Sequence, residues 1–301
     1  MTDRESDHCI VPSNPGNAGR GKAVAPTRSP KDPPTIRSDG ASVYDRLDYI
    51  HQRAQRQSTA TFDNVFHLLK FKLLLLAFRQ LKPGKASGVA GVSLEDYASK
   101  LLVNLRDLES RLQRGAYHPQ PSLRRDIPKG NGKTRPLGIA CVEDKIVQRA
   151  VVMILERIYE VDFIDDSYGF RPGRSCHDAL KTLGRQIGTR KVNFVSDSDI
   201  RSFFDEVDHG KLLELLQIRI RDKRLLRLIA RFLKAGVMID GDWWKSERGV
   251  PQGSVLSPLL ANVYLHYVLD RWFENVVKRL AGEAYLVRYA DDCAPGNVHL
   301  R

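Results

Sequence analysis

Two adjacent carboxylates follow a short apolar run towards the end of this 301-residue chain. Residues 284–289 predict a short strand that leads to Asp291 and Asp292. Adjacent carboxylates repel each other, and a divalent cation removes this repulsion because carboxylate oxygens are suitable ligands for Mg²⁺. An ordinary turn is the alternative, since Asp is a favoured turn residue. The choice between a metal site and a turn depends on features further upstream in the sequence.

A second acidic position ends the strand predicted at 191–199. Residues two apart on a strand share a face, so Asp197 and Asp199 are expected to point the same way. Either one could serve as a metal ligand, and a solvated aspartate at a strand end is the alternative.

A glycine-rich loop, Gly249-Val250-Pro251-Gln252-Gly253, precedes a helix that is predicted from Pro258. Glycines on both sides of Gln252 allow the backbone to come close to a ligand. The loop could line a nucleotide pocket, or it could be a structural turn.

The charge of the chain favours a nucleic-acid partner. The net charge is +12, and nucleic acid is the commonest polyanionic partner of so basic a protein. A hairpin predicted at 116–140 has a mobile glycine turn at 129–133 that could close over a triphosphate, or it could be a solvated basic hairpin. Its surroundings contain one acid, Asp126, and seven cations: Arg111, Arg114, Arg124, Arg125, Lys129, Lys133 and Arg135. A second basic cluster, within residues 219–234, predicts a nucleic-acid backbone contact or a solvated helix face.

Helices and strands are expected to alternate along the chain. One helix carries the apolar residues from Phe62 to Leu76 and ends at 82–84, and a second begins at Ser93, capped with Asp96 three residues on. Further elements are expected as a helix at 142–158, helices at 209–218 and 222–234, a hairpin at 236–247, and a helix at 258–280 that ends before Gly282 and whose apolar face includes Trp272, Val276 and Leu280. Strands interleaved with helices indicate an α+β layered domain.

Composition excludes several other classes of protein. Residues 1–42 are rich in Pro, Gly and Ser and predict a disordered tail. The four cysteines are far apart, which argues against zinc or a disulfide framework and favours the reducing cytoplasm. No apolar run is long enough to span a bilayer.

Four sequence blocks, in this order, resemble the reverse transcriptases encoded by group II introns. The resemblance covers about residues 60–293. The blocks are Ser167-Tyr168-Gly169-Phe170-Arg171-Pro172-Gly173-Arg174-Ser175, then Asp199-Ile200-Arg201-Ser202-Phe203-Phe204-Asp205, then residues 249–262 from Gly249 to Asn262, and last Tyr289-Ala290-Asp291-Asp292.

The resemblance implies a right-hand polymerase with fingers and a ferredoxin-like palm sheet. The expected divisions are a helical N-terminal extension and start of the fingers at 43–115, fingers at 116–190, and an incomplete palm at 191–293. It implies that Asp199, Asp291 and Asp292 are the catalytic residues and hold two Mg²⁺ ions.

The resemblance also implies nucleotide and template contacts. Phe204 is expected beneath the sugar of the incoming nucleotide, where it favours deoxynucleotides, or it is a core phenylalanine. The remaining expected nucleotide contacts are Lys129, Arg135, Gln252 and Gly253, and the expected nucleic-acid contacts are Arg124, Arg125, Arg171 and Arg174. Arg171 and Arg174 could instead brace the fingers against the palm. The implied partners are an intron RNA template, a DNA primer and dNTPs, and a homodimer is left open.

The chain departs from the family after Cys293. Residues 294–297 do not resemble the expected return strand, because Pro295 cannot donate to a ladder and Pro-Gly favours a turn. We therefore expect an aberrant tail at 294–301, no thumb, and a truncated copy with little independent activity. The predicted function is an RNA-directed DNA polymerase, and a non-catalytic intron-RNA-binding maturase is the alternative. A phosphohydrolase is disfavoured, because a nuclease needs no pocket that senses the sugar.

Overall fold

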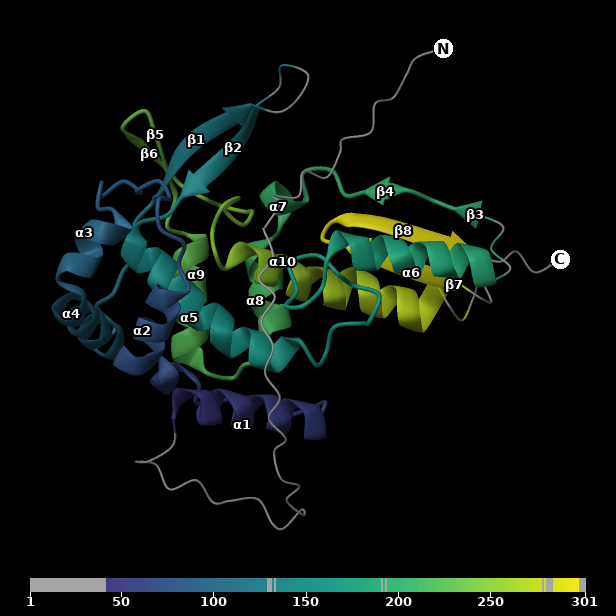
Figure 1. The fold of residues 1–301 in the computed structure, drawn as a ribbon, viewed down its shortest axis with the longest axis horizontal. Coiled ribbons are helices and arrows are strands. Elements are labelled where there is room, and N and C mark those ends of the chain that lie inside the picture. The colour runs from purple at the N-terminus through teal and green to yellow at the C-terminus, as the bar shows by residue number, and fades with distance from the viewer. Residues whose placement is uncertain are drawn as a thin grey trace, which may run out of the picture. The chain divides into compact units, whose positions relative to one another are not determined.

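A long buried helix, α5 (Val142–Tyr159), lies at the centre of the largest hydrophobic core. The structure, a computed structural model, describes residues 42–128, 132, 134–190, 192, 194–277, 279 and 284–297, all within the compact unit Gly40–Arg301. Three helices pack against α5, namely α1 (Val43–Arg56), α2 (Phe71–Arg79) and α10 (Ser257–Leu265). Most side chains of α5 are buried, so the surrounding helices fold around it (Figure 1).

The chain between α1 and α2 is not the single helix that the apolar spacing predicts. A 3₁₀ helix, η1 (Phe66–Leu68), precedes α2, and Phe62 forms an isolated β-bridge. The Asp222 carboxylate accepts hydrogen bonds from the backbone nitrogens of Val65 (2.9 Å) and Phe66 (2.7 Å). Because this side chain competes for the backbone donors, the α-helix begins only at Phe71.

The helix expected from Ser93 is confirmed, with one break. Ser93 and Asp96 form the predicted capping box at the start of α3 (Leu94–Ser99). The helix is interrupted at Lys100 and continues as α4 (Leu101–Gln113).

The first sheet contains both predicted hairpins, in the order β2-β1-β5-β6. Strands β1 (Ser122–Pro128) and β2 (Thr134–Ile139) are antiparallel. Strand β5 (Val237–Ile239) pairs in parallel with β1 and antiparallel with β6 (Asp242–Trp244). The turn residues Lys129 and Lys133 lie outside the described residues.

The second sheet joins strands that are far apart in the sequence. Strand β8 (Asp292–Asn297) pairs with β7 (Ala284–Tyr289) on one side. On its other side it pairs with β3 (Phe194–Val195) and β4 (Ser198–Asp199). All these pairs are antiparallel, so β8 is the central strand of this sheet (Figure 1).

Strand β8 corrects two expectations from the sequence. Residues 294–297 do form the return strand, and the single strand expected at 191–199 is split into β3 and β4. Pro295 accepts a hydrogen bond from the backbone nitrogen of Ser196 (2.9 Å), but it has no N–H to return one. The ladder is therefore incomplete opposite Pro295, and regular pairing resumes at Ser198.

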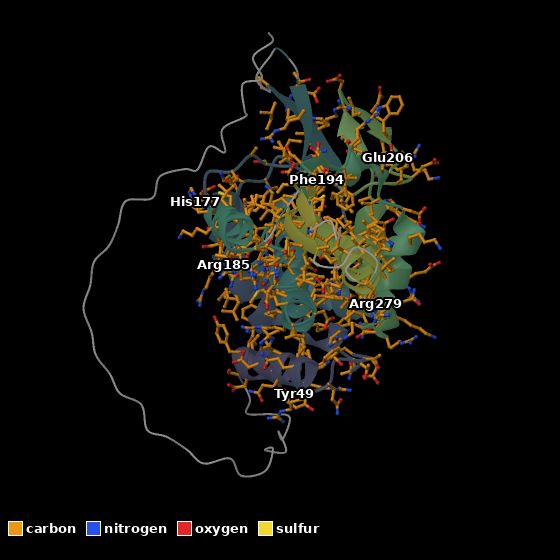
Figure 2. All side chains as sticks on the ribbon, turned by 90° about the vertical axis from the view of Figure 1, so that its right-hand side faces the viewer. Tyr49, His177, Arg185, Phe194, Glu206 and Arg279 are labelled. Carbon is orange, nitrogen blue, oxygen red and sulfur yellow. The ribbon has the colours of Figure 1, made fainter. Side chains whose placement is uncertain are left out.

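The helices between residues 176 and 233 are α6 (Cys176–Thr189), α7 (Phe203–Glu206), α8 (His209–Gln217) and α9 (Lys223–Leu233). Of these, α8 and α9 occupy the predicted positions, and α6 and α7 were not predicted. Helix α6 packs beside β7, and its exposed residues His177 and Arg185 project away from the sheet (Figure 2).

The helix expected at 258–280 is only partly regular. It begins as α10 and continues as the π-helical segments η3 (His266–Asp270) and η4 (Phe273–Val277). Leu265 and Phe273 of the predicted apolar face are buried. Trp272, however, is 51% exposed and Val276 is 38% exposed, so the face is buried only in part. A π-helical turn holds more residues than an α-helical turn, so an apolar stripe at α-helical spacing drifts off the core. Leu280 and Gly282 lie outside the described residues.

The α+β class predicted from the sequence is confirmed. The predicted disordered tail lies outside the described residues apart from Ser42, which caps α1. The boundaries predicted between extension, fingers and palm stay a prediction. None of the described helices is long and apolar enough to cross a membrane.

Candidate active site

Asp199 and Asp292 face each other across the antiparallel pair β4–β8. The hydrogen bond from Ser196 to Pro295 sets the alternation of the ladder, so the Asp199–Asp292 pair exchanges no backbone hydrogen bonds. Side chains of such a pair lie on one face with Cβ atoms about 4.5–5.5 Å apart. Asp291 directly precedes Asp292 in the turn between β7 and β8. The structure therefore brings the three predicted acids together at one edge of the sheet, the end at which β4 finishes and β7 turns into β8.

The acids at this edge influence one another. Burial raises the pKa of Asp291 and of Asp292 above the ordinary aspartate value, and the negative charge of Asp199 raises both further. Asp197 adds to the effect on Asp292. Asp197 lies opposite residue 294, whereas Asp199 lies directly opposite Asp292, so Asp199 is the better placed of the two alternatives. Negative charge is concentrated here, and a divalent cation would relieve the repulsion.

The chemistry of these donors fits a divalent metal, although the side chains do not enclose one. In the part of the chain that the structure describes, no three His, Cys, Asp or Glu side chains already form a metal-binding group. The sheet edge nevertheless supplies only carboxylate oxygens, which suit Mg²⁺. Asp199 and Asp292 are exposed, so both can rotate towards an ion.

The turn that carries Asp291 contains a strained residue. Ala290 and Asp291 form a two-residue loop between Tyr289 and Asp292, which are paired. Ala290 has a φ of +60°, a left-handed conformation that is uncommon for a residue with a Cβ. A two-residue loop fixes the register of its strands, so this turn sets which residue of β8 faces Asp199.

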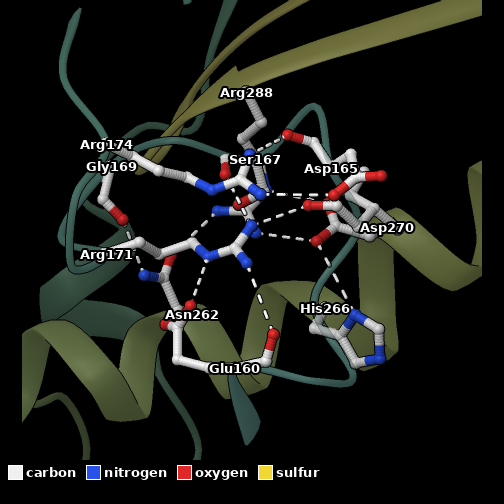
Figure 3. A network of polar contacts seen from close by, with 11 residues as sticks. Glu160, Asp165, Ser167, Gly169, Arg171, Arg174, Asn262, His266, Asp270 and Arg288 are labelled. Atoms are coloured by element: carbon white, nitrogen blue, oxygen red, sulfur yellow. Dashed lines mark hydrogen bonds and ion pairs between the residues drawn. The ribbon is translucent and has the colours of Figure 1, made fainter. Parts of the chain in front are cut away.

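A buried arginine holds this turn in place (Figure 3). The Arg288 side chain is fully buried and donates two hydrogen bonds of 2.7 Å to the carboxylate of Asp270. Its remaining terminal nitrogen donates to the Ala290 carbonyl (2.8 Å) and to Oδ1 of Asn262 (3.1 Å). Asn262 in turn donates to the carbonyl of Gly169 (2.7 Å). This network ties the acidic turn to the long C-terminal helix and to the loop at residue 169.

Sequence reasoning assigned no role to Asn262, Asp270 or Arg288. The available signal is Arg288 itself, a charged residue inside an otherwise apolar strand. A buried charge requires a partner. Asp270 is 18 residues away on a different element, so the sequence does not reveal which acid that partner is.

Arg171 is a buried residue with structural contacts, and its predicted contact with nucleic acid stays a prediction that this burial disfavours. Its side chain is 3% exposed and pairs with the carboxylate of Glu160 at 3.1 Å. It also donates to the carbonyls of Ile164 and Ser167, both at 2.7 Å. These bonds brace the loop before α6. All three partners lie within the predicted fingers, so these bonds do not test the alternative that Arg171 braces the fingers against the palm.

The glycine loop at 249–253 is held against two other segments. His209 donates from Nε2 to the Gly249 carbonyl (2.7 Å), and the backbone nitrogen of Gly138 donates to the Gln252 carbonyl (2.6 Å). A Cβ on Gly249 would lie 2.9 Å from the carbonyl oxygen of Phe204. Glycine is therefore required where the loop crosses α7, as the sequence indicated for a close backbone approach.

A groove of about 270 Å³ opens beside this loop. Phe204 and Gln252 line it, and Gln252 contacts the carboxylate of Asp205 at 3.4 Å. The ring of Phe204 meets the ring of Phe170 edge-on, with centroids 6.3 Å apart, and Phe170 follows the glycine that contacts the acidic turn. The three acids do not themselves line the groove. Other lining residues are Arg124, Trp244, Lys245 and Arg248.

The predicted basic contacts divide between the two faces of the first hairpin. The β1–β2 register places Arg125 and Arg135 on one face and Arg124 on the other. Arg124 lines the groove and pairs with Asp126 at 3.1 Å, while Arg125 and Arg135 are exposed. Lys129 lies outside the described residues, and its contact and that of Arg135 stay predictions.

Arg174 and Gly253 complete the predicted set. Arg174 donates to the carbonyl and to the carboxylate of Asp165, and its side chain is 26% exposed. Its contact with nucleic acid stays a prediction. Gly253 has a φ of +97°, and a Cβ there would lie 2.7 Å from the Gly138 carbonyl, so it packs against β2.

Comparison with known proteins agrees with this arrangement. The family described as reverse transcriptase (RNA-dependent DNA polymerase) matches residues 127–296, more than half of the chain. Group II intron-encoded protein LtrA of Lactococcus lactis subsp. cremoris is 41% identical over 72% of this chain and 37% of its own length. Protein YkfC of Escherichia coli K12 is 41% identical over 64% of this chain and 55% of its own length.

A more distant relative carries a different name. Nuclear intron maturase 2, mitochondrial, of Arabidopsis thaliana is 26% identical over 83% of this chain and 40% of its own length. The chain thus spans about 37–55% of the length of these three relatives. The resemblance indicated by the four sequence blocks is confirmed: the chain belongs to the reverse transcriptase (RNA-dependent DNA polymerase) family and is related to the group II intron-encoded proteins.

Proposed function

We propose that this chain is an RNA-directed DNA polymerase, which transfers a nucleotidyl group from a dNTP to a primer 3′-hydroxyl on an RNA template. The observation that carries the proposal is the register of β4 and β8, which sets Asp199 opposite Asp292 beside a turn that holds Asp291. A simple RNA-binding surface would not need clustered carboxylates, because they repel phosphate, and the chain as a whole has a charge of +12.

Asp199, Asp291 and Asp292 would hold two divalent cations, which we expect to be Mg²⁺. When bound, such ions lower the pKa of the attacking hydroxyl and neutralise charge on the transferred phosphoryl group. The protein's own part is positional. Arg288 holds the Ala290 carbonyl, and the paired strands hold Asp199 and Asp292 on one face.

The groove beside the glycine loop is the proposed nucleotide site. Phe204 would pack beneath the sugar and exclude a 2′-hydroxyl by steric contact, and Gln252 with Gly253 would support the base and sugar. Arg124, Lys245 and Arg248 line the same groove, and arginine and lysine suit the charge of a triphosphate. Lys129 stays a proposed contact, and Arg135 is a proposed contact from the other face of the hairpin.

The intron RNA template and DNA primer follow from the relatives and from the basic charge. LtrA is named as a group II intron-encoded protein, and the same kind of RNA is proposed as the template here. A cytoplasmic location is part of this proposal, and a homodimer is left open.

A maturase, an RNA-binding cofactor of intron splicing, is the second candidate. It is supported by the relative named nuclear intron maturase 2. Both functions can coexist, because binding of intron RNA does not require the acids at the sheet edge.

Primer extension separates the two functions. The chain is incubated with an RNA template, an annealed DNA primer, dNTPs and Mg²⁺, and is compared with D291N and with D63N, which removes an exposed carboxylate elsewhere. We expect extension by the unchanged protein and by D63N, and a loss of about a thousandfold or more in D291N. Binding of Mn²⁺, followed by electron paramagnetic resonance, should weaken in D291N and not in D63N.

Each outcome bears on a different part of the proposal. Equal extension by D291N and the unchanged protein contradicts the metal assignment. No extension by any of the three, with RNA binding intact, contradicts polymerase activity of this chain and leaves the maturase candidate.

A further inference from the structure

A second groove, of about 210 Å³, lies between the C-terminal end of α4 and helix α9. We call it the arginine groove. Its lining contains no acid, and the residues that matter for its chemistry are Arg114, Arg224, Arg227 and Arg231. The lining aromatic residues Phe66 and Tyr117 are buried and form the floor of the groove. None of its lining residues belongs to β4, β7, β8 or the loop at 249–253, so it is separate from the candidate active site.

The positive charge of the arginine groove is not neutralised by the protein. No carboxylate among the described residues forms an ion pair with any of its four arginines. Helix α9 itself carries four cations and no acid. Like charges gathered in one groove repel each other, so an anion bound there would be stabilised.

Two of the four arginines also have a structural role. Arg231 donates to the carbonyls of Gly115 (3.1 Å) and Tyr117 (2.8 Å). Arg224 donates to the Gln113 carbonyl (2.8 Å) and lies over the Phe66 ring at 4.1 Å. They bind carbonyls at the end of α4, which cations commonly do at a helix C-terminus. These bonds also fix the two guanidinium groups in the groove.

The other two arginines, Arg114 and Arg227, have no comparable structural role. Arg114 makes only a long bond of 3.4 Å to a carbonyl of its own helix. Arg227 makes no hydrogen bond or ion pair within the described part of the chain. Arg219, just before α9, shows the contrast, since it is buried and paired with the carboxylate of Asp162. The charge of Arg219 is therefore neutralised within the protein, and the charges of Arg114 and Arg227 are not.

We propose that the arginine groove binds the phosphate backbone of RNA, at a place separate from the acidic sheet edge. The choice of RNA as the polyanion rests on the proposed function. Guanidinium groups match phosphate oxygens with paired hydrogen bonds. RNA held in this groove would be anchored without blocking the groove beside Phe204.

The test measures binding of a fluorescein-labelled RNA hairpin by fluorescence anisotropy over a series of salt concentrations. The variant R114Q/R227Q removes the two arginines that have no structural partner. The control K181Q/R185Q removes two exposed charges from α6 (Figure 2). We expect R114Q/R227Q to lose about tenfold in affinity and to lower the salt slope by about two, and the control to change neither appreciably.

Three results would overturn the proposal. The first is hairpin binding by R114Q/R227Q with unchanged affinity and slope. The second is an equal loss in K181Q/R185Q, which would show a diffuse charge effect. The third is competition by a polyglutamate peptide as strong as competition by unlabelled hairpin, which would show that the groove accepts any acidic polymer. The variant R114K/R227K keeps both charges and should retain the salt slope, which separates an effect of charge from an effect on folding. A reduced salt slope in this variant would be a further result against the proposal.

The proposal for the arginine groove and the proposal of polymerase activity can be contradicted by different results. D291N should lose primer extension and keep its affinity for the hairpin. If the unchanged protein does not extend a primer while R114Q/R227Q still binds RNA more weakly, the polymerase proposal fails and the groove stands.

Discussion

Gly169 packs directly against the backbone of Ala290: a Cβ on this glycine would lie 2.9 Å from the Ala290 Cα and overlap its amide nitrogen. Ala290 is the left-handed residue of the acidic turn. The glycine of one sequence block, Tyr168-Gly169-Phe170, is therefore needed by the turn of another, Tyr289-Ala290-Asp291-Asp292. This contact links the loop at residue 169 to the position of the acids.

Replacing Gly169 by alanine should damage both stability and activity. The neighbours are backbone atoms and cannot move aside, so the turn has to shift. We expect a loss of at least about 2 kcal/mol in the free energy of unfolding, measured with urea, because overpacking of a tight site is costly. We also expect primer extension to need more Mg²⁺, because Asp291 and Asp292 move with the turn.

Gly184→Ala is the matched control for this change. Gly184 lies on α6, and a Cβ there would meet nothing within 4 Å. The same substitution should leave extension unchanged and stabilise the helix by up to about 1 kcal/mol. If Gly169→Ala and Gly184→Ala unfold at the same urea concentration, the packing argument is wrong.

Arg288→Lys should weaken the support of the acidic turn although it preserves the charge. Lysine offers a point charge and cannot form both bonds to Asp270 while it holds the Ala290 carbonyl. Breaking a buried pair costs about 3–5 kcal/mol when a charge is left without its partner. Because lysine keeps the charge and loses only hydrogen bonds, we expect a smaller loss for Arg288→Lys, about 1–3 kcal/mol in the free energy of unfolding, together with slower nucleotide incorporation.

A double-mutant cycle checks that the effect arises in the Arg288–Asp270 pair. Asp270→Asn should also be destabilising, and the double variant should lose clearly less than the sum of the two single losses. Additive losses would show that Arg288 acts through other contacts, and an unchanged stability of Arg288→Lys would remove its positioning role.

Structural features that depend on nearby residues were predicted correctly from the sequence. Capping at Ser93, the face of α5 and the hairpin at β1–β2 depend on residues a few positions apart, and all three are confirmed. The three acids were correctly expected at one sheet edge, because the family resemblance supplied the long-range pairing that periodicity cannot.

The errors arose where a distant group decides the local structure. The helix through Phe62–Leu76 is broken because Asp222, far along the chain, takes its backbone donors. Pro295 argued against a strand at 294–297. The strand forms because it pairs with β7 along its whole length, and Pro295 lacks a donor only on the side of Ser196. The sequence left a template contact and a bracing role open for Arg171, because its short-range sequence gives no sign of burial by Glu160 and two carbonyls.

Phe204→Ala should relax discrimination between deoxynucleotides and ribonucleotides. The ring is half-buried at the groove, braced edge-on by Phe203 at 5.6 Å and Phe170 at 6.3 Å. Removing it opens space for a 2′-hydroxyl, so the ratio of kcat/KM for rNTP to that for dNTP should rise by roughly tenfold to a hundredfold. Single-nucleotide incorporation measures this ratio. Phe170→Ala should change it less, and an unchanged ratio in Phe204→Ala would make Phe204 a packing residue only.

His266→Phe should make the protein less sensitive to acid. His266 is buried beside Asp270 and stacks edge-on against Phe163, and burial lowers the pKa of its imidazole to about 4, with the positive charges of Arg271 and Arg288 adding to the effect. Between its ordinary pKa of about 6.5 and pH 4 the unfolded chain binds a proton that the folded chain does not. The stability that this residue contributes is therefore present above pH 6.5 and is lost as the pH falls towards 4, by at most about 3 kcal/mol.

Phenylalanine cannot be protonated and fits a ring-lined site, so His266→Phe should be as stable as the unchanged protein at pH 7 and more stable than it at pH 4.5. Urea unfolding at both pH values gives the difference directly. Ring nitrogen Nδ1 of His266 has no hydrogen-bond partner in the described part of the chain, so its loss leaves no buried group unpaired. An identical pH dependence in the two proteins would mean that His266 titrates normally and is accessible to water.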